Sequence, residues 1–425
     1  MAKNKTADLV IIGNGVAGNS AALSARQTRP DMSICILGCE EHPEYSPGIL
    51  PNYLAGSVER EQVFIRTKED YQANKIQLYL GQLVEAIDPD KAVVYTDSTR
   101  IKYSQLILAT GSQAIIPPVS GSSLPGNFVL KTLFDTDQII QYPAQSAVVI
   151  GSGAIGLEAA LALKKRGYEE VSLIEKEKWV LPKSLDEDTA RMVEHMLEQE
   201  GVQVYTAETV ESVQGKEKVQ GVVTDQREIP CQIIAWAVGV RPNVSLATSM
   251  GITLGETGGI KVDPYMCTNI PQVYACGDCV ESTDLFSGQQ VLNLLWDAAY
   301  RQGKIAGINC AGGRIQYPGS FGVLLTYVGE APVLSIGLTA ADLGNQDYEI
   351  WERTGHHSYG RLLIKQDRLV GVQMLGTLEG AGWILSQLHT RNLISMEAQN
   401  PSLAMMLGSQ AMFKGFLKNF TRQNH

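Results

Sequence analysis

Two glycine-rich segments in this chain have the spacing that suits the binding of phosphate groups. Residues 13–18 read GNGVAG after an apolar run, and residues 151–156 read GSGAIG after another. In such a segment the first glycine permits a tight turn, the second lets the backbone approach a pyrophosphate, and the third lets a helix pack closely on a strand. The helix that follows points its unpaired N–H groups and its positive end at the phosphates. Two copies in one chain therefore predict two bound dinucleotides, an arrangement that serves hydride transfer between them.

A carboxylate follows each glycine segment at the distance expected of a group that binds the adenosine ribose. Glu40 lies 22 residues after Gly18, and Glu175 lies 19 residues after Gly156. The alternative, that both segments are ordinary tight turns of α/β units, is disfavoured by the paired carboxylates. Glu175 also indicates NADH rather than NADPH, because a carboxylate about 4 Å from a 2′-phosphate costs roughly 1–4 kcal/mol. Neighbouring lysines at 176 and 178 weaken that preference unless they point to solvent.

The composition bounds the size and class of the protein. A chain of 425 residues with 44% hydrophobic and 19% charged residues is expected to form two or three globular domains. No uninterrupted apolar run reaches about 18 residues, so no membrane span is expected. The first strand begins close to the N-terminus, so a cytoplasmic location is expected. The net charge of −10 argues against nucleic-acid binding, which needs a basic surface.

The cysteines and histidines show no metal-binding pattern. Seven cysteines and six histidines lack zinc-ligand spacing, so no metal is predicted. A disulfide framework is not expected in a reducing compartment. Cys276 and Cys279 have the spacing of a redox dithiol, but a strand ending in a Gly-Asp turn explains the same residues. We favour the turn.

Alternating strand-like and helix-like runs predict an α/β fold. Residues 1–40 and 145–180 each read as strand, glycine turn, helix and strand, which is the beginning of a parallel sheet. Further helices are predicted over 61–74, 189–199 and 296–308, and further strands over 76–84, 92–95 and 105–108. From residue 320 the pattern changes to strands over 321–327, 361–365 and 369–374, a helix over 380–393 and an amphipathic terminal helix over 393–420.

Five segments together resemble the FAD-dependent pyridine nucleotide–disulfide oxidoreductases. They are the two glycine segments and residues 106–112 (LILATGS), 237–243 (AVGVRPN) and 274–279 (YACGDC), in the order of that family. The most similar branch contains NADH:rubredoxin oxidoreductases, the flavin part of nitrite reductase, NADH oxidases and coenzyme A disulfide reductases. The resemblance implies two Rossmann-like domains of the glutathione reductase type and a small α+β domain. It places the FAD-binding domain at 1–115 and 244–319, the NAD-binding domain at 116–243 and the C-terminal domain at 320–425.

The resemblance also assigns residues to each dinucleotide. FAD would contact Gly13, Gly15, Ala17, Gly18, Glu40, Val84, Ala109, Thr110, Gly111, Gly277 and Asp278. NADH, as substrate, would contact Gly151, Gly153, Ile155, Gly156, Glu158, Glu175, Val238 and Gly239. Pro47, Glu158 and Trp296 would face the flavin ring. No proton-transfer residue is assigned, because the flavin itself carries the redox chemistry. In relatives the C-terminal domain often forms a dimer interface, so a homodimer is also expected.

One position departs from the thiol-dependent members of the family. They carry a flavin-facing cysteine where this chain has Pro47, and proline can form neither a sulfenic acid nor a mixed disulfide. We therefore expect an FAD-dependent NADH:acceptor oxidoreductase whose acceptor is an iron–sulfur carrier such as rubredoxin or ferredoxin. One alternative is a reductase of coenzyme A disulfide or peroxide that uses Cys39 or the Cys276–Cys279 pair. Others are an NADH oxidase and, in another class, a flavin-binding interaction or sensor subunit.

Overall fold

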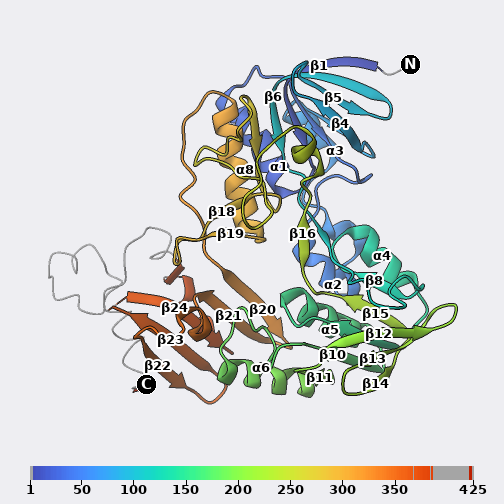
Figure 1. Ribbon diagram of the computed structural model, residues 1–425, viewed down its shortest axis with the longest axis vertical. Helices are drawn as coiled ribbons and strands as arrows, with labels where there is room; N and C mark the ends of the chain where they lie inside the picture. The colour runs from blue at the N-terminus through green and yellow to red at the C-terminus, as the bar shows by residue number, and fades with distance from the viewer. Residues whose placement is uncertain (1–2, 367, 383, 386–420, 424–425) are drawn as a thin grey trace. The chain divides into compact units, whose positions relative to one another are not determined.

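The computed structural model describes residues 3–366, 368–382, 384–385 and 421–423 (Figure 1). The chain forms two compact units, of which the first contains residues 3–115, 131–136 and 240–321. The second contains 116–130, 137–239 and the described residues from 322 onward. The division into four domain segments stays a prediction, but the described C-terminal residues group with the second glycine segment. Among the described residues, no helix combines the length and apolarity needed to cross a membrane.

The first unit is built on a seven-stranded sheet with the order β3-β2-β1-β6-β5-β4 and with β17 paired to β6. The strands are β1 (Lys3–Ile12), β2 (Ile34–Leu37), β3 (Ile76–Tyr79), β4 (Val84–Asp88), β5 (Val93–Thr96), β6 (Thr99–Leu108) and β17 (Val273–Ala275). β3, β2, β1, β6 and β17 run parallel. The order reverses between β1 and β6, and ligands of such sheets bind at the carboxyl ends of the strands at that reversal.

Both faces of this sheet are covered, which explains the continuous apolar runs in its central strands. Leu9, Val10 and Ile11 are fully buried, and alternate residues belong to two separate hydrophobic clusters, one on each face.

The other elements of the unit are α1 (Val16–Thr28), η1 (Pro47–Ile49), α2 (Leu50–Leu54), η2 (Arg60–Val63), α3 (Lys68–Ala73), α7 (Ser245–Ser249), α8 (Trp296–Cys310), β7 (Ser112–Ala114), β16 (Val240–Pro242), β18 (Glu281–Thr283) and β19 (Gln290–Leu292).

Helices α1 and α8 pack against each other almost backbone to backbone (Figure 1). A Cβ atom on Gly303 would lie 2.2 Å from the carbonyl oxygen of Ala17, and one on Gly307 would lie 2.1 Å from that of Ala21. Because both contacts advance by four residues in the same direction, the two helices run parallel. The predicted helix over 296–308 is therefore confirmed, and its small residues serve this close approach.

The predicted helix over 61–74 is wrong in its middle. Thr67 accepts a hydrogen bond from the Asp70 amide and forms a capping box, so a separate helix, α3, begins at Lys68 after the short turn η2. A threonine at an N-cap competes with helix continuation because its side chain satisfies a free backbone donor. The strand predicted over 76–84 is likewise two strands, β3 and β4, on opposite edges of the sheet.

The second unit contains a five-stranded parallel sheet with the order β11-β10-β9-β15-β8. The strands are β8 (Asn127–Val129), β9 (Ser146–Ile150), β10 (Glu170–Ile174), β11 (Gln203–Tyr205) and β15 (Ile233–Trp236). The helices of this unit are α4 (Leu133–Gln141), α5 (Ala154–Arg166) and α6 (Glu187–Gln199), and the first residues of α4 belong to the first unit. A separate three-stranded sheet contains β12 (Val210–Gly215), β13 (Val219–Thr224) and β14 (Glu228–Pro230). The order reverses between β9 and β15, so a second ligand-binding edge is expected there.

A six-stranded antiparallel sheet, here called the C-terminal sheet, completes the second unit. The order of its strands is β20-β21-β24-β23-β22-β25. The strands are β20 (Val323–Val328), β21 (Ala331–Gly337), β22 (Glu349–Thr354), β23 (Tyr359–Lys365), β24 (Arg368–Leu375) and β25 (Thr421–Gln423). The short helix α9 (Ala340–Leu343) follows β21. The three predicted strands are confirmed, and β21, β22 and β25 were missed. The predicted helix over 393–420 and most of the one over 380–393 lie outside the described residues.

Candidate functional site

The glycines of the first fingerprint have three different environments. Gly13 follows β1 with φ +117°, and a Cβ atom there would lie 2.0 Å from the Ala109 carbonyl oxygen. A Cβ atom on Gly18 would lie 2.0 Å from the Gly13 carbonyl oxygen. By contrast, a Cβ atom on Gly15 would meet nothing within 4 Å. Gly13 and Gly18 are therefore required by the turn and by helix packing, while Gly15 borders open space at the N-terminus of α1.

The second fingerprint repeats this pattern on β9 and α5. Gly151 has φ +99°, and its Cβ atom would lie 2.5 Å from the Ala237 carbonyl oxygen. A Cβ atom on Gly156 would lie 1.8 Å from the Gly151 carbonyl oxygen, whereas one on Gly153 would meet nothing within 4 Å. Each unit therefore offers an open, side-chain-free cradle at a helix N-terminus, which is the geometry that a pyrophosphate requires.

Glu175 directly follows β10 and reaches back to the second fingerprint. Its carboxylate accepts hydrogen bonds from the Ser152 amide (2.8 Å) and the Ser152 hydroxyl (2.6 Å). It also accepts one from the Glu177 amide at 3.0 Å. Lys176 is exposed and pairs with Glu177 at 3.6 Å, so it does not neutralise Glu175. The predicted ribose-binding carboxylate thus lies beside the loop that it is expected to serve.

Glu40 lies differently from Glu175. In the strand register Ile12 pairs with Leu37 and Ile150 pairs with Ile174, so the residue equivalent to Glu175 is Gly38. Glu40 comes two residues later, and its carboxylate accepts a hydrogen bond from the Tyr45 hydroxyl at 2.9 Å. The spacing in the sequence therefore located the acidic residue near the fingerprint, but its part in binding FAD stays a prediction.

Asp278 has two partners that sequence reasoning missed. Ser112 donates a hydrogen bond to its Oδ2 atom at 2.7 Å, and Lys131 lies 3.1 Å from the same atom. The neighbouring Gly277 follows β17, and its amide donates to the buried side chain of Gln302 at 2.8 Å. Lys131 lies far from Asp278 in sequence and in no motif, so only the fold could reveal it.

Two other predicted FAD contacts, Ala109 and Thr110, directly follow the carboxyl end of β6. Ala109 donates its amide to the Ile12 carbonyl at 2.8 Å, which places the 109–111 turn beside the fingerprint. Thr110 exchanges hydrogen bonds with Asn243 at 2.6 and 2.9 Å. Val84 begins β4 on an edge of the sheet and is buried. In the second unit, Val238 and Gly239 follow β15 just as the fingerprint follows β9.

A buried tyrosine holds the fingerprint loop of the first unit. The Tyr71 hydroxyl donates to the Asn14 side-chain oxygen at 3.0 Å and accepts from the Glu44 amide at 3.2 Å. Asn19 donates to the Asn14 carbonyl oxygen at 2.8 Å. No sequence motif links these residues, because α3 is brought to the loop by the tertiary fold. The loop is therefore ordered by side chains before a ligand binds.

We predict that Tyr71→Phe weakens FAD binding by roughly tenfold, because Asn14 loses a donor and the Glu44 amide is left buried without a partner. Titration of FAD-free protein with FAD, followed by flavin fluorescence, measures the change. Coenzyme binding to the second unit is the control and should not change. An unaltered FAD affinity in a less stable variant would show that Tyr71 supports only the fold.

Glu44 makes the stability of this region depend on pH. Burial raises the pKa of Glu44 from 4.5 to about 6, although Arg66, whose Nε lies 2.7 Å away, acts in the opposite direction. Since the folded-state pKa lies above the unfolded value, the folded state binds more protons between these pH values. The contribution of Glu44 to the free energy of unfolding therefore falls as pH rises through this window, by up to about 2 kcal/mol.

We therefore predict that wild-type protein loses more stability than Glu44→Gln between about pH 5 and about pH 7. Urea unfolding of both proteins at the two pH values measures the difference. Parallel pH dependence of the two proteins would contradict the prediction.

Trp296 begins α8, well beyond the N-terminus of α1. Gly303 packs beside Ala17, so α8 extends about 9 Å further in the N-terminal direction at 1.5 Å per residue. Trp296 is 48% exposed and stacks on Tyr300, with ring centroids 5.5 Å apart and planes inclined by 6°. The N-termini of α1 and α8 therefore point in the same direction and are offset along the helix axes. This offset suits an extended dinucleotide with a ring system at one end.

Glu158 lies on α5 and contacts the C-terminal sheet. Thr326 of β20 donates a hydrogen bond to its Oε1 atom at 2.9 Å. Burial raises the pKa of Glu158, and the Thr326 hydrogen bond opposes that shift. The exposed Ile155 lies on the first turn of the same helix. The structure therefore brings both residues to the N-terminal half of α5, next to the second fingerprint.

The cysteines lack the environment of reactive thiols. Cys276 and Cys279 are completely buried, and burial raises the pKa of both. Cys39 is exposed, but partial burial and the neighbouring Glu40 raise its pKa too. Pro47 begins η1 and is exposed. Since thiolates are the nucleophiles of disulfide and peroxide chemistry, these side chains do not favour a sulfur relay.

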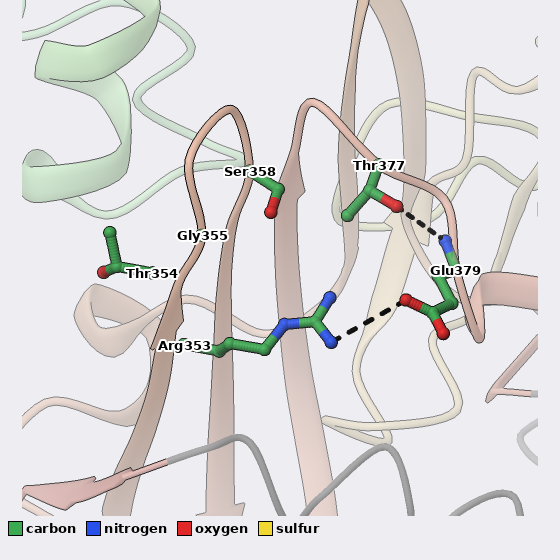
Figure 2. A pocket seen from close by; sticks show the side chains of 6 residues that line it. All are labelled: Arg353, Thr354, Gly355, Ser358, Thr377 and Glu379. Atoms are coloured by element: carbon green, nitrogen blue, oxygen red, sulfur yellow. Dashed lines mark hydrogen bonds and ion pairs between the residues drawn. The ribbon is translucent and has the colours of Figure 1, made fainter.

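A polar pocket of about 480 Å³ lies in the C-terminal sheet (Figure 2). Arg353 extends toward Glu379, and their charged groups are 3.8 Å apart. The remaining lining residues are Thr354, Gly355, Ser358 and Thr377. None of these residues belongs to either fingerprint, so the pocket is separate from the two cradles.

Comparisons with known proteins agree with this geometry. The family model described as pyridine nucleotide-disulphide oxidoreductase matches residues 7–303. An NADH oxidase of Methanocaldococcus jannaschii is 35% identical over 342 residues, covering 78% of this chain and 76% of that protein. An NAD-dependent persulfide reductase from A. fulgidus has a TM-score of 0.84 at 29% identity, covering 91% of this chain and 76% of that chain. A putidaredoxin reductase in covalent complex with putidaredoxin has a TM-score of 0.80 at 25% identity, covering 91% and 93%.

The chain belongs to the pyridine nucleotide-disulphide oxidoreductase family. The predicted α/β fold with Rossmann-type domains is confirmed, and the protein is an FAD-dependent NADH oxidoreductase. It also spans about half the length, 50% and 49%, of two larger curated relatives. The whole activity of those larger proteins is therefore not attributed to it.

Proposed function

We propose that this protein passes electrons from NADH through FAD to a small iron–sulfur protein. The observation that carries the proposal is the pair of open glycine cradles, at Gly15 and Gly153, combined with Pro47 at the position to which the family resemblance assigns the flavin-facing cysteine of thiol-dependent members. Two cradles support two dinucleotides, and the absence of a thiol at residue 47 removes the usual route to sulfur substrates. The remaining route is transfer to an external acceptor.

FAD is assigned to the first unit. The N-terminus of α1 at Gly15 would hold its pyrophosphate, and Asp278, oriented by Ser112 and Lys131, would accept hydrogen bonds from its hydroxyl groups. The N-terminus of α8 at Trp296 would support the ring system. When bound, FAD accepts a hydride and can release the two electrons singly, which suits an iron–sulfur acceptor.

NADH is assigned to the second unit. Gly153 and the N-terminus of α5 would bind its pyrophosphate, and Glu175 would bind the adenosine ribose. The carboxylate of Glu175 is held by Ser152, so a 2′-phosphate would approach a fixed negative charge. This arrangement supports the preference for NADH. NADPH with an equal or larger kcat/KM would contradict it.

The thiol-dependent alternatives require groups that are poorly placed here. Persulfide or coenzyme A disulfide reduction needs a thiolate, and the described environments of Cys39, Cys276 and Cys279 raise their pKa values. Direct oxygen reduction, suggested by the name of the Methanocaldococcus relative, needs no thiol and is the second candidate. Structural neighbours that support a protein acceptor are a ferredoxin reductase from Rhodopseudomonas palustris and the putidaredoxin reductase in complex with putidaredoxin. A homodimer and a cytoplasmic location stay predictions.

An anaerobic comparison of acceptors tests the proposal. NADH-reduced protein is mixed with rubredoxin, with a ferredoxin and with coenzyme A disulfide, and a separate sample is mixed with oxygen. We expect the fastest reoxidation with one of the iron–sulfur proteins. Faster turnover with coenzyme A disulfide or oxygen would contradict the proposed acceptor class while leaving the NADH and FAD sites intact.

A further inference from the structure

The loop over residues 176–186, here called the coenzyme loop, connects Glu175 to α6 and folds back on the second fingerprint. The Leu181 amide donates to the Ser152 carbonyl at 3.1 Å. Leu181 is buried and has φ +51°, an uncommon conformation for a residue with a side chain. Such a conformation persists only where surrounding contacts impose it. The Leu181 carbonyl accepts hydrogen bonds from within the loop, and the Leu181 amide adds the contact to the fingerprint, so both local and outside contacts hold this loop in place.

The C-terminal sheet supplies further outside contacts at the end of the loop (Figure 1). Asp186, the last residue of the loop, is 7% exposed, and its Oδ2 atom lies 3.1 Å from Nε of Arg361 on β23. Its Oδ1 atom accepts a hydrogen bond from the Ala340 amide at 2.7 Å. Its own amide donates to the Gln373 side chain on β24 at 3.1 Å. Two residues earlier, the Ser184 carbonyl accepts a hydrogen bond from Ser335 on β21.

Arg361 is the charged centre of this contact. It is 5% exposed, and its Nη1 atom also lies 2.9 Å from Asp188 and 3.1 Å from Glu352. A buried ion pair contributes little net stability compared with apolar packing, but it fixes the relative position of its partners. Removing Arg361 would leave the Asp186 carboxylate buried without its cation, so the end of the loop would shift toward water.

We propose that Arg361 is a positioning residue for NADH: it holds Asp186, and through it the coenzyme loop, against the second fingerprint. This inference rests on the proposed assignment of NADH to the second unit. It gives the C-terminal sheet a part in binding the coenzyme. Arg361 acts through the loop, so it should influence NADH affinity rather than the chemical step.

The test uses the full-length holoenzyme and steady-state kinetics with NADH and ferricyanide. We expect Arg361→Met to raise KM for NADH by roughly tenfold, with kcat and the bound FAD unchanged. Arg361→Lys keeps the charge and should recover part of the affinity. Asp188→Asn is the matched control, because it removes only the exposed partner of the same guanidinium group, and it should leave KM nearly unchanged.

The inference would be overturned if the Arg361→Met variant folds, carries FAD and has the same KM for NADH as the wild type. If that variant does not fold, Ser335→Ala removes one hydrogen bond to the loop and should raise KM by about two- to threefold. A wild-type KM in Ser335→Ala would then overturn it. Failure of the proposed NADH site is distinguishable, because wild-type protein would then show no saturable NADH-dependent activity.

Discussion

Gly153→Asp should abolish reduction of the protein by NADH while leaving the fold and the bound FAD unchanged. A Cβ atom at Gly153 would meet nothing within 4 Å, and the residue has φ −66° and ψ 179°, which any L-amino acid adopts. Aspartate is also a favourable N-cap for α5, better than glycine by only about a few tenths of a kcal/mol. The same carboxylate would occupy the proposed pyrophosphate position. Repulsion of about 4 kcal/mol at a surface-like dielectric corresponds to roughly a thousandfold loss of affinity.

The measurement is the rate of flavin reduction under anaerobic conditions as NADH concentration is varied. FAD content and the urea unfolding curve serve as controls and should match those of the wild type. Gly153→Ala, which intrudes without a charge, should have an intermediate effect. Efficient reduction of the Gly153→Asp variant by NADH would refute the assignment of the second fingerprint.

Gly15→Asp should yield a folded but FAD-free protein. Gly15 has the same open surroundings and φ −80°, ψ −175°, so the substitution is sterically acceptable in the unliganded loop. Its carboxylate would lie at the N-terminus of α1 against the FAD pyrophosphate, with the same predicted repulsion of about 4 kcal/mol. The variant should therefore lose FAD affinity by roughly a thousandfold.

Absorbance of the purified protein gives its flavin content, and addition of excess FAD tests whether binding recovers. Coenzyme binding to the second unit, followed by calorimetry with NAD⁺, should persist and shows that the chain has folded. Gly15→Asp that is purified with a full complement of FAD would place the flavin elsewhere. Together, the two aspartate variants separate the two sites, since each should lose one ligand and keep the other.

Local sequence patterns predicted the parts of the site that are themselves local. The fingerprints could be recognised because three glycines within six residues carry distinct steric demands, and the structure reproduces those demands at Gly13, Gly18, Gly151 and Gly156. Glu175 could be found because a parallel strand places its next residue beside the neighbouring loop. The same rule applied to the first unit leads to Gly38, so counting residues to Glu40 was a weaker guide.

Residues that act across the fold could not be predicted from one sequence. Tyr71 reaches Asn14 only because α3 packs beside the loop, and Lys131 reaches Asp278 across 147 sequence positions. Arg361 lies in a strand that was predicted, but its buried partner Asp186 belongs to a loop with no periodicity. The break at Thr67 was missed although Thr67 and Asp70 form a capping box there. For Tyr71, Lys131 and Arg361, tertiary contacts determine the outcome, whereas the capping box at Thr67 is a local signal that the sequence itself carries.

The most direct test of the whole account is an anaerobic titration of the FAD-loaded protein with NADH, with thiols counted before and after. We expect the flavin absorbance to bleach with about one NADH per flavin, because a hydride carries the two electrons that FAD accepts, and the number of accessible thiols to stay constant. Persistent flavin colour with excess NADH, or consumption of further NADH together with two newly exposed thiols, would contradict direct transfer from NADH to FAD without a sulfur relay.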